Sequence, residues 1–456
     1  GSEMCIRDRC ILCLNSFCYK KKGDKMTFNA LKEKGIPIEK QLRYWHDIAK
    51  RKFNKYEVDC YSRTRQILMN GIEVEAWNFK HCFSRCCNDE ETMNYLALTK
   101  RIEDQQQTTI NWMSPADQSV LETTLGYEQV AVDLTAWLAQ NEPDEYVRET
   151  FNFGLLEDFD HLYRYSQWAY MIHGINPDDI VQAQTDIMLG RPTQNHHNDN
   201  VLRLRKPYDK MTASPQTKVN IMTLVAGEQQ THNYYAEHGM QYGNHTLRET
   251  FAEIKDVEEE HVNMYESLAD PTESFYEKAL LHEFTEVCNY YTCYQDEVDD
   301  MMKPVWELFL AQELGHLEHA AKLFKKHEKR DPEEVIGTEI VLPCHFESQK
   351  DYVRNILENE IDKRLGTDKD YTVIEKLPKD WASYEVQETV NKEGSPTECT
   401  IKLIKEAKKR DIILADEKLK KETPKLLKRG LQPEAQAEDT VTVEEYKEMA
   451  SEEFEM

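Results

Sequence analysis

The chain has 456 residues, which is long enough for a large buried core and for more than one domain. Its 84 acidic residues outnumber its 57 basic residues and give a net charge of −27, which argues against nucleic acids and anionic membrane surfaces as partners. No apolar run approaches the roughly 20 residues of a membrane-spanning helix, so we expect a soluble, cytoplasmic protein without a membrane partner.

The first 25 residues are expected to be a non-native leader. The stretch SEMCIRDR, Ser2–Arg9, resembles read-through of a sequencing adapter with a tag, and a natural start would then lie at Met26. Four of the twelve cysteines fall in this leader, and the other eight include no Cys-x-x-Cys pair, so we interpret those eight as free thiols of a reducing compartment. Residues 26–59, which contain IEKQLRYWHDIAKRKFNKY, are expected to be helical.

Residues 60–330 are predicted to form eight helices, because strand-like alternation is scarce and only 16 Gly and 15 Pro interrupt the chain. Start signals precede several of these helices: SPAD from Ser114, NEPD from Asn141, SPQ from Ser214 and DPTE from Asp270. In the last of these signals, Asp270 and Glu273 would form a capping box, with Pro271 at the first helical position.

We expect the helices to form two pairs of hairpins joined by a long connection. The first pair occupies residues 26–172, the second pair occupies residues 214–337, and residues 173–213 form a crossover loop of unusual length. Residues 338–431 are predicted to be a mixed, mainly helical region, with an amphipathic helix in FESQKDYVRNILENEIDKRL and a strand or loop in DYTVIEKL. Residues 432–456 are expected to be a disordered acidic tail.

An internal repeat relates the four hairpins. The sequence RETF occurs at Arg148–Phe151 and again at Arg248–Phe251, an offset of 100 residues, and a second register without gaps has an offset of 155 residues. Each hairpin carries an acid on its first helix and, 30 residues later, a second acid. The second acid is followed at i+3 by histidine or, in the first hairpin, by glutamine. The four sets are Glu73, Glu103 and Gln106; Glu128, Asp158 and His161; Glu228, Glu258 and His261; and Glu283, Glu313 and His316.

The repeated acids are expected to face one another inside the fold. The turns of the hairpins lie about 13 to 17 residues from the acid on either side, so the two acids of a hairpin have nearly the same height along the helices. An acid and a histidine at i and i+3 project from one helix face. Carboxylates that meet at one level in a low dielectric repel one another, and bound metal is the simplest source of the cation that they require.

In these residues the chain resembles the ferritin-like superfamily of di-metal carboxylate proteins, and its rubrerythrin branch most. The closest match is AGEQQTHNYYAEHG, residues 226–239, followed by FAEIKDVEEEHVNMYESL, residues 251–268. LGYEQ with LLEDFDHLYRY and LLHEF with AQELGHLEHA are similar. The resemblance covers residues 60–330. It implies an all-α fold of ferritin-like four-helix bundles, in which the repeated acids and histidines bind metal.

Departures from the family pattern affect the expected sites. Asp158 replaces a glutamate, and Gln106 replaces a histidine, so a site that uses the first hairpin is expected to be altered or empty. The single long crossover leaves the pairing of hairpins open: the second with the third, the third with the fourth, or the second with the fourth and the first with the third. One site and two sites are both compatible with this pattern. His261, followed by Glu258 and Glu228, is the first-ranked ligand.

Several nearby side chains are interpreted without a metal role. The glutamates expected to be solvated are Glu259, Glu260 and Glu266. The histidines expected to have structural or surface roles are His196, His197, His282 and His319. Tyr165 and Tyr265 follow their histidines by four residues and would face the same way. They are candidates for electron relay or for a hydrogen bond to a metal ligand, although core packing is the expected role.

Sites rich in carboxylates, with one histidine per metal, suit iron and also manganese. The resemblance implies a di-iron oxidoreductase that reduces or activates dioxygen or peroxide. Because the four cysteines of a rubredoxin-like domain are absent, such an enzyme would need an external electron donor, and an oxygenase would also need an organic substrate. The alternative is a non-catalytic protein for iron binding, iron storage or redox sensing. An oligomer is compatible with either function.

Overall fold

Eight long helices make up most of the structure, a computed structural model that describes residues 28–407 except 51, 189, 192, 194–196, 360–362 and 367–368. The long helices are α3 (Cys60–Cys86), α4 (Glu90–Asn111), α5 (Val120–Asn141), α6 (Glu145–His173), α9 (Pro215–His238), α10 (His245–Glu266), α11 (Phe275–Asp296) and α12 (Lys303–Glu328). The predicted all-α class is confirmed, and so are the eight helical segments between residues 60 and 330.

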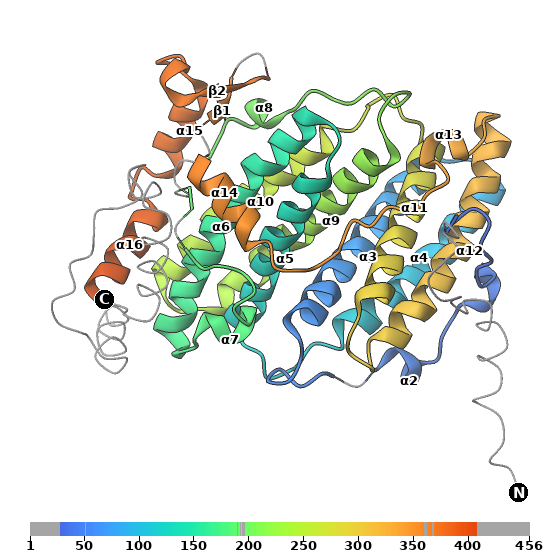
Figure 1. Cartoon of the computed structure of the whole chain (residues 1–456), viewed down its shortest axis with the longest axis horizontal. Helices are drawn as coiled ribbons and strands as arrows, with labels where there is room; N and C mark the ends of the chain where they lie inside the picture. Colours follow the sequence, from blue (N-terminus) through green and yellow to red (C-terminus); the bar gives the residue numbers. More distant parts are fainter. Residues whose placement is uncertain are drawn as a thin grey trace, which may run out of the picture.

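The long helices pack in two layers of four (Figure 1). One layer has the order α6, α5, α3, α4, and the other has the order α10, α9, α11, α12, so each hairpin lies within one layer. The central helices α3, α5, α9 and α11 contact one another across the layers. At the two ends α6 contacts α10, and α4 contacts α12. The second hairpin therefore faces the third, and the first faces the fourth.

The helix starts follow local capping chemistry. Ser214 accepts a hydrogen bond from the backbone N–H of Thr217, with Pro215 at the first helical position, as predicted. The capping box predicted at Asp270 is wrong, because α11 begins four residues later, with Ser274 and Glu277 as its capping box. The carboxylate of Asp270 instead accepts hydrogen bonds from the backbone N–H groups of Thr272 and Lys210.

The N-terminal segment corrects a second prediction. Among the described residues of 28–59, which leave out 51, only η1 (Ile38–Lys40) and α2 (Trp45–Ile48) are helical, so the long helix expected in 26–59 is wrong. The segment lies against α12, where the backbone N–H of Ile36 donates to the carbonyl of Ala311. The Gln41 side chain donates to the carbonyls of Ile36 and Gln312. These contacts fix Gln41 beside the fourth hairpin.

A close backbone approach between this segment and α12 gives a prediction. A Cβ added at Gly315 would overlap the carbonyl oxygen of Ile36. We expect Gly315→Ala to lower the free energy of unfolding by about 2 kcal/mol, even though alanine is the better helix former. Gly227→Ala in α9 is the control, because its Cβ would be 4.0 Å from the nearest side chains. Thermal unfolding measures both variants, and equal melting temperatures would contradict the prediction.

The connection between the two halves and the C-terminal region cover the α6–α10 end. The predicted crossover contains two short helices, α7 (Pro177–Val181) and α8 (Asn200–Arg203). The remaining helices are η3 (Gly239–Gln241), α13 (Glu333–Ile336), α14 (Lys350–Asn359), η4 (Ile374–Lys376), α15 (Ala382–Val390) and α16 (Pro396–Ala407). Helix α16 packs against α10 and α6, and α14 packs against α5. Among the described residues, no helix combines the length and the apolar character needed to cross a membrane.

The C-terminal region also contains a small sheet. The strands β1 (Lys363–Leu365) and β2 (Tyr371–Val373) pair antiparallel, with Arg364 opposite Thr372. Of the two alternatives expected for DYTVIEKL, the structure has the strand. The helix predicted to reach Leu365 is wrong over Lys363–Leu365, because these residues pair as β1. The leader expected at residues 1–25 and the acidic tail expected at 432–456 lie outside the described residues.

Candidate metal centre

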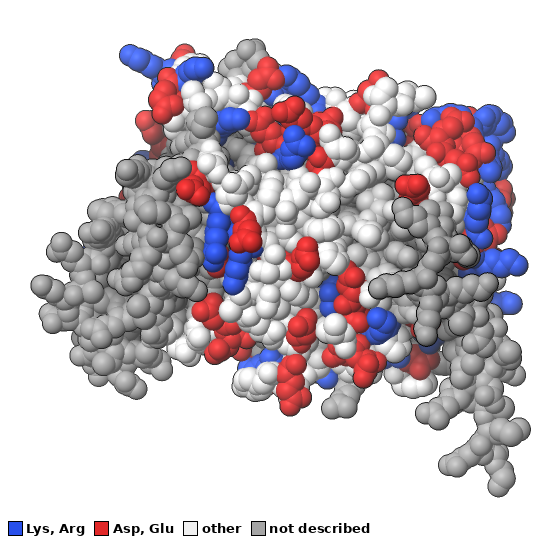
Figure 2. All heavy atoms as spheres, in the orientation of Figure 1, with Lys and Arg blue, Asp and Glu red and all other residues white. Residues whose placement is uncertain are grey.

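The acids and histidines of the repeat are buried inside the helical layers. On the face shown in Figure 2, acidic and basic side chains form scattered groups with uncharged side chains between them. The repeat residues are all among the buried polar side chains: Glu73, Glu103, Gln106, Glu128, Asp158, His161, Glu228, Glu258, His261, Glu283, Glu313 and His316. They gather in two clusters, one between the second and third hairpins and one between the first and fourth. This arrangement is the first of the pairings that the sequence left open.

Cluster A comprises Glu128, Asp158, His161, Glu228, Glu258 and His261, contributed by α5, α6, α9 and α10. Glu258 lies at its centre. Its Oε1 atom is 3.0 Å from Nδ1 of His161, and its Oε2 atom is 3.1 Å from Nδ1 of His261. The two imidazole rings are 6.2 Å apart between centroids, and their planes are inclined by 27°. One carboxylate therefore faces both histidines.

Cluster A divides into two groups of potential ligand atoms that share Glu258. In the first group, atoms of Asp158, Glu228, Glu258 and His261 all lie within 4.8 Å of one another. In the second group, atoms of Glu128, His161 and Glu258 meet the same condition. Within the first group, Nδ1 of His261 is 3.3 Å from Asp158 and 3.6 Å from Glu228. Each group thus contains one histidine, one acid from a first helix of a hairpin, and Glu258.

The electrostatics of cluster A show an unmet demand for positive charge. Among the described residues, Asp158, Glu228 and Glu258 form ion pairs with histidine but with no lysine or arginine. Glu128 accepts a hydrogen bond from the hydroxyl of Tyr235. Both carboxylate oxygens of Asp158 and of Glu228 are buried without a hydrogen bond. Burial, and then the charge of Glu228, raises the pKa of Asp158 well above its usual range.

The carboxylate at the centre and one histidine have pKa values that their neighbours shift. Burial alone would raise the pKa of Glu258, but the rings of His161 and His261 lower it to about 2. Burial alone would lower the pKa of His261, but Asp158, Glu157 and Glu228 raise it well above its usual value. A buried set of carboxylate oxygens and imidazole nitrogens with this demand for positive charge fits divalent metal ions.

Residues outside the repeat orient cluster A. Nε2 of His261 lies 2.6 Å from Oε2 of Glu157, so the other ring nitrogen, Nδ1, faces Glu258. Nη1 of Arg203 is 3.2 Å from Glu157, and Nε of Arg203 is 2.5 Å from Glu260. On the other side, the hydroxyl of Tyr235 donates a hydrogen bond to Glu128. Sequence reasoning missed these residues, because Glu157 lies beside a motif acid and Arg203 lies in the crossover.

Three of the side chains interpreted without a metal role differ from expectation or fall outside the description. Glu260 is buried rather than solvated, because it pairs with Arg203 and accepts from the backbone N–H of Asn198. His197 is also buried rather than at the surface, and its ring lies 3.6 Å from Glu260. His196 lies outside the described residues. The crossover therefore supplies buried polar groups beside cluster A.

The two candidate tyrosines are buried in the apolar part of this half. The ring of Tyr165 packs against Tyr235 and Phe251, with centroid distances of 5.1 and 4.9 Å. The Tyr265 ring is 6.0 Å from the ring of His261. Neither tyrosine hydroxyl has a hydrogen-bond partner in the part of the chain that the structure describes, so the observed contacts of both side chains are those of core packing.

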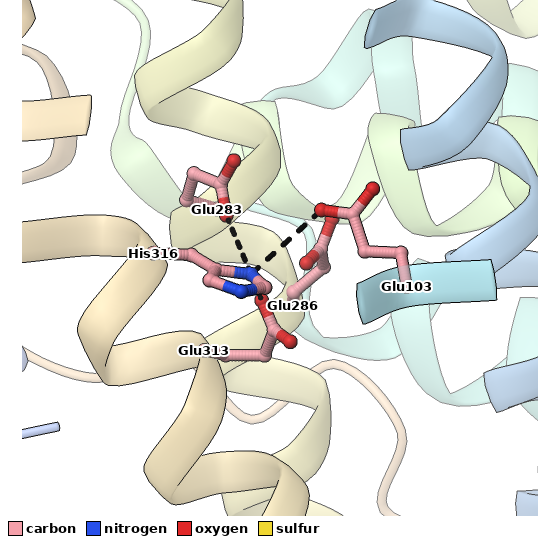
Figure 3. Close-up of side chains that lie close together, drawn as sticks. All are labelled: Glu103, Glu283, Glu286, Glu313 and His316. Carbon is pink, nitrogen blue, oxygen red and sulfur yellow. Dashed lines mark hydrogen bonds and ion pairs between the residues drawn. The ribbon is translucent and has the colours of Figure 1, made fainter. Parts of the chain in front are cut away.

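Cluster B comprises Glu73, Glu103, Gln106, Glu283, Glu313 and His316, from α3, α4, α11 and α12. Figure 3 shows Nδ1 of His316 directed at Glu103 and Glu283, at 3.7 and 3.6 Å. The same atom is 2.8 Å from Glu313, whose other oxygen accepts a hydrogen bond from Gln106 at 2.6 Å. Glu73 accepts from the hydroxyl of Tyr290 and is not part of the compact ligand group.

Two further charged residues lie in cluster B, and sequence reasoning missed both. Glu286 joins the compact group of Glu103, Glu283, Glu313 and His316. Lys80 is completely buried, and its ammonium forms ion pairs with Glu103 and, at 2.8 Å, with Glu283. The repeat contained a signal for Lys80, because at the offset of 155 residues this lysine aligns with Tyr235.

The protonation of cluster B differs from that of cluster A. Burial alone would lower the pKa of Lys80, but the nearby carboxylates, Glu283 first, raise it above its usual value. Burial lowers the pKa of His316 to about 4, and the Lys80 ammonium acts in the same direction. The positive charge in cluster B therefore resides on lysine, whereas in cluster A it resides on histidine.

Comparisons with known proteins identify no relative. No protein-family model, no curated protein and no solved structure matches this chain. The geometry of the two clusters is therefore the basis for assigning a function.

Proposed function

We propose that cluster A binds two metal ions and that the protein is a di-metal oxidoreductase of the ferritin-like type. The observation that carries this proposal is the position of Glu258 between the Nδ1 atoms of His161 and His261. A carboxylate with one oxygen toward each histidine is arranged to bridge two ions. The acids Glu128 and Glu228 complete the two groups from opposite layers.

The donor set supports iron, with manganese as the second choice. Four carboxylates and two imidazoles provide hard and borderline ligands without a thiolate, which suits these ions better than copper(I) or a structural zinc. Bound iron would supply one-electron redox chemistry and coordination positions for dioxygen or peroxide. The proposed reaction is therefore the reduction or activation of one of these oxidants, with electrons from an external donor.

The surrounding residues have defined tasks in this proposal. Glu157 holds the His261 ring by its Nε2 atom, and Arg203 holds Glu157. Tyr235 donates to one oxygen of Glu128, which leaves the other oxygen, buried and without a hydrogen bond, for a ligand role. The complete burial of Glu258 and both histidines excludes bulk water from the centre.

Metal analysis tests the proposal. After anaerobic reconstitution with ferrous iron and desalting, we expect about two iron ions per chain, the content of a di-iron carboxylate site. Less than about half an ion per chain would contradict the proposal, because the family's ligand arrangement binds a pair. Manganese reconstitution under the same conditions determines whether iron is preferred.

A kinetic experiment separates the oxidoreductase from an iron-storage or redox-sensing protein. The reconstituted protein is mixed with peroxide or dioxygen in the presence of a reductant. An oxidoreductase consumes oxidant through many turnovers per bound metal pair. A storage or sensing protein consumes only an amount in proportion to the iron that it has bound, and that result would reject the catalytic part of the proposal.

A further inference from the structure

We infer that cluster B is a metal-free counterpart of cluster A, in which the ammonium of Lys80 takes the place of the metal ions. Lys80 is completely buried, and its ammonium lies between carboxylates of α4 and α11, namely Glu103 and Glu283. A further consequence is that removal of this ammonium opens a second metal site in the same chain. This inference concerns cluster B alone and does not depend on the chemistry proposed for cluster A.

The correspondence between the clusters shows what Lys80 replaces. At the offset of 155 residues, Lys80 aligns with Tyr235, and Glu283 aligns with Glu128. In cluster A the hydroxyl of Tyr235 donates to Glu128, and in cluster B the ammonium of Lys80 pairs with Glu283. The two side chains therefore reach the equivalent carboxylate from the equivalent helix position. Only the one in cluster B carries a charge.

The ammonium also contacts the carboxylate that would bridge two ions. Glu103 aligns with Glu258, the carboxylate shared by both halves of cluster A. In cluster A the oxygens of Glu258 face two histidine nitrogens, but in cluster B Glu103 forms an ion pair with Lys80. A divalent ion bound to this oxygen would be within a few ångströms of a buried positive charge, and the two positive charges would repel each other strongly in the low dielectric.

Two further substitutions compensate for the lysine. Gln106 aligns with His261 of cluster A. The Gln106 amide donates a hydrogen bond to Glu313, whereas His261 forms an ion pair with Asp158. This removes one imidazole nitrogen from the ligand set. Glu286 stands where the other half of the repeat has Ala131, and it adds one carboxyl group to the cluster that contains Lys80. Charge and hydrogen bonds in cluster B are thus arranged around an internal cation.

Lys80→Met tests the inference, because methionine has a similar volume and no charge. We expect Lys80→Met, after anaerobic reconstitution with ferrous iron, to contain about one to two more iron ions per chain than the unaltered protein, because its carboxylates then lack a cation. The added iron should also raise the melting temperature of Lys80→Met more than that of the unaltered protein, because the ion restores charge to buried acids.

Matched variants identify where the extra metal binds. The double variant Lys80→Met/Glu103→Gln should return to the metal content of the unaltered protein, because it lacks the proposed bridging carboxylate. Lys218→Met removes a different buried lysine, whose ammonium donates to the carbonyl of Lys210, and it should not change the metal content. The single variant Glu103→Gln should retain all the metal of the unaltered protein.

Three outcomes would overturn the inference. The first is a Lys80→Met variant that folds but gains no iron. The second is a gain that persists in the double variant. The third is loss of metal from Glu103→Gln in the presence of Lys80, which would show that cluster B already binds metal. This third measurement tests the inference even where Lys80→Met does not fold. An unaltered protein without iron would reject the function proposed for cluster A, while the gain in Lys80→Met would still support the inference.

Discussion

Glu258→Ala is expected to remove both metal ions from cluster A. This carboxylate is the one ligand that the two groups share, so its loss affects both positions, whereas loss of Glu128 or Glu228 affects one position. We expect the metal content after reconstitution to fall from about two ions per chain to less than about a fifth of that value, because each position keeps too few charged ligands. Turnover with dioxygen or peroxide should fall in the same proportion. Elemental analysis and oxidant consumption measure the two effects.

The control is Glu103→Ala, which removes the equivalent carboxylate of cluster B. Both glutamates are completely buried on the second helix of a hairpin, so the two variants remove the same group from similar surroundings. Glu103→Ala should lower the melting temperature, because it takes one partner from Lys80, but it should retain the metal of cluster A. Greater loss of metal and activity in Glu103→Ala would show that cluster B is the working centre and would contradict the assignment.

The sequence predicted the helices and the inward-facing residues of the fold because both follow from short-range patterns. Each of the four copies has an acid and then a second acid followed at i+3 by histidine, or by Gln106 in the first hairpin. This pattern identifies the buried face of each hairpin without knowledge of its neighbours. The N-terminal segment was predicted wrongly because its conformation depends on a distant partner. Position 35 has no room for a side chain, because a Cβ there would overlap the backbone of Gly315. The side chain of Gln41 donates a hydrogen bond to the carbonyl of Gln312.

The candidate site was predictable one hairpin at a time, but the pairing of hairpins was not. Each copy of the motif has the same inward face, so the repeat is compatible with several arrangements of four hairpins. The contacts between α6 and α10 and between α4 and α12 decide this question. The motif residues that meet there, such as His161 with Glu258, have equivalents in the other hairpins, so the motif alone does not select the partner. The single long crossover left three pairings open, and the second hairpin with the third is the one in the structure.

The buried lysine and arginine side chains were the largest omission from the sequence-based prediction, and the reason is physical. A lysine or arginine within a helical pattern is normally expected at the surface, because burial of an unpaired charge is costly. Lys80 and Arg203 are buried because each meets two carboxylates from other parts of the chain. Those carboxylates are far from the lysine and the arginine in sequence, and the distances along the chain differ from the spacings of the repeated motif. For Lys80 the repeat alone provided a signal, since its counterpart is an uncharged tyrosine.

Arg203→Met is expected to weaken both the fold and the metal site. Arg203 is buried, and its guanidinium pairs with Glu157 and Glu260, so its loss leaves two buried carboxylates with less compensation. Breaking such a buried pair costs about 3 to 5 kcal/mol, which should lower the melting temperature by several degrees. Glu157 also orients His261, so we expect metal affinity to fall about tenfold or more, as for other groups that orient a ligand.

Arg65→Met separates the two effects, because Arg65 forms a similar buried pair with Glu297 and no contact with cluster A. It should lower the melting temperature but keep the metal affinity. Calorimetry and competition with a metal-binding dye measure the two quantities, and equal metal affinity in both variants would show that Arg203 has only a structural role.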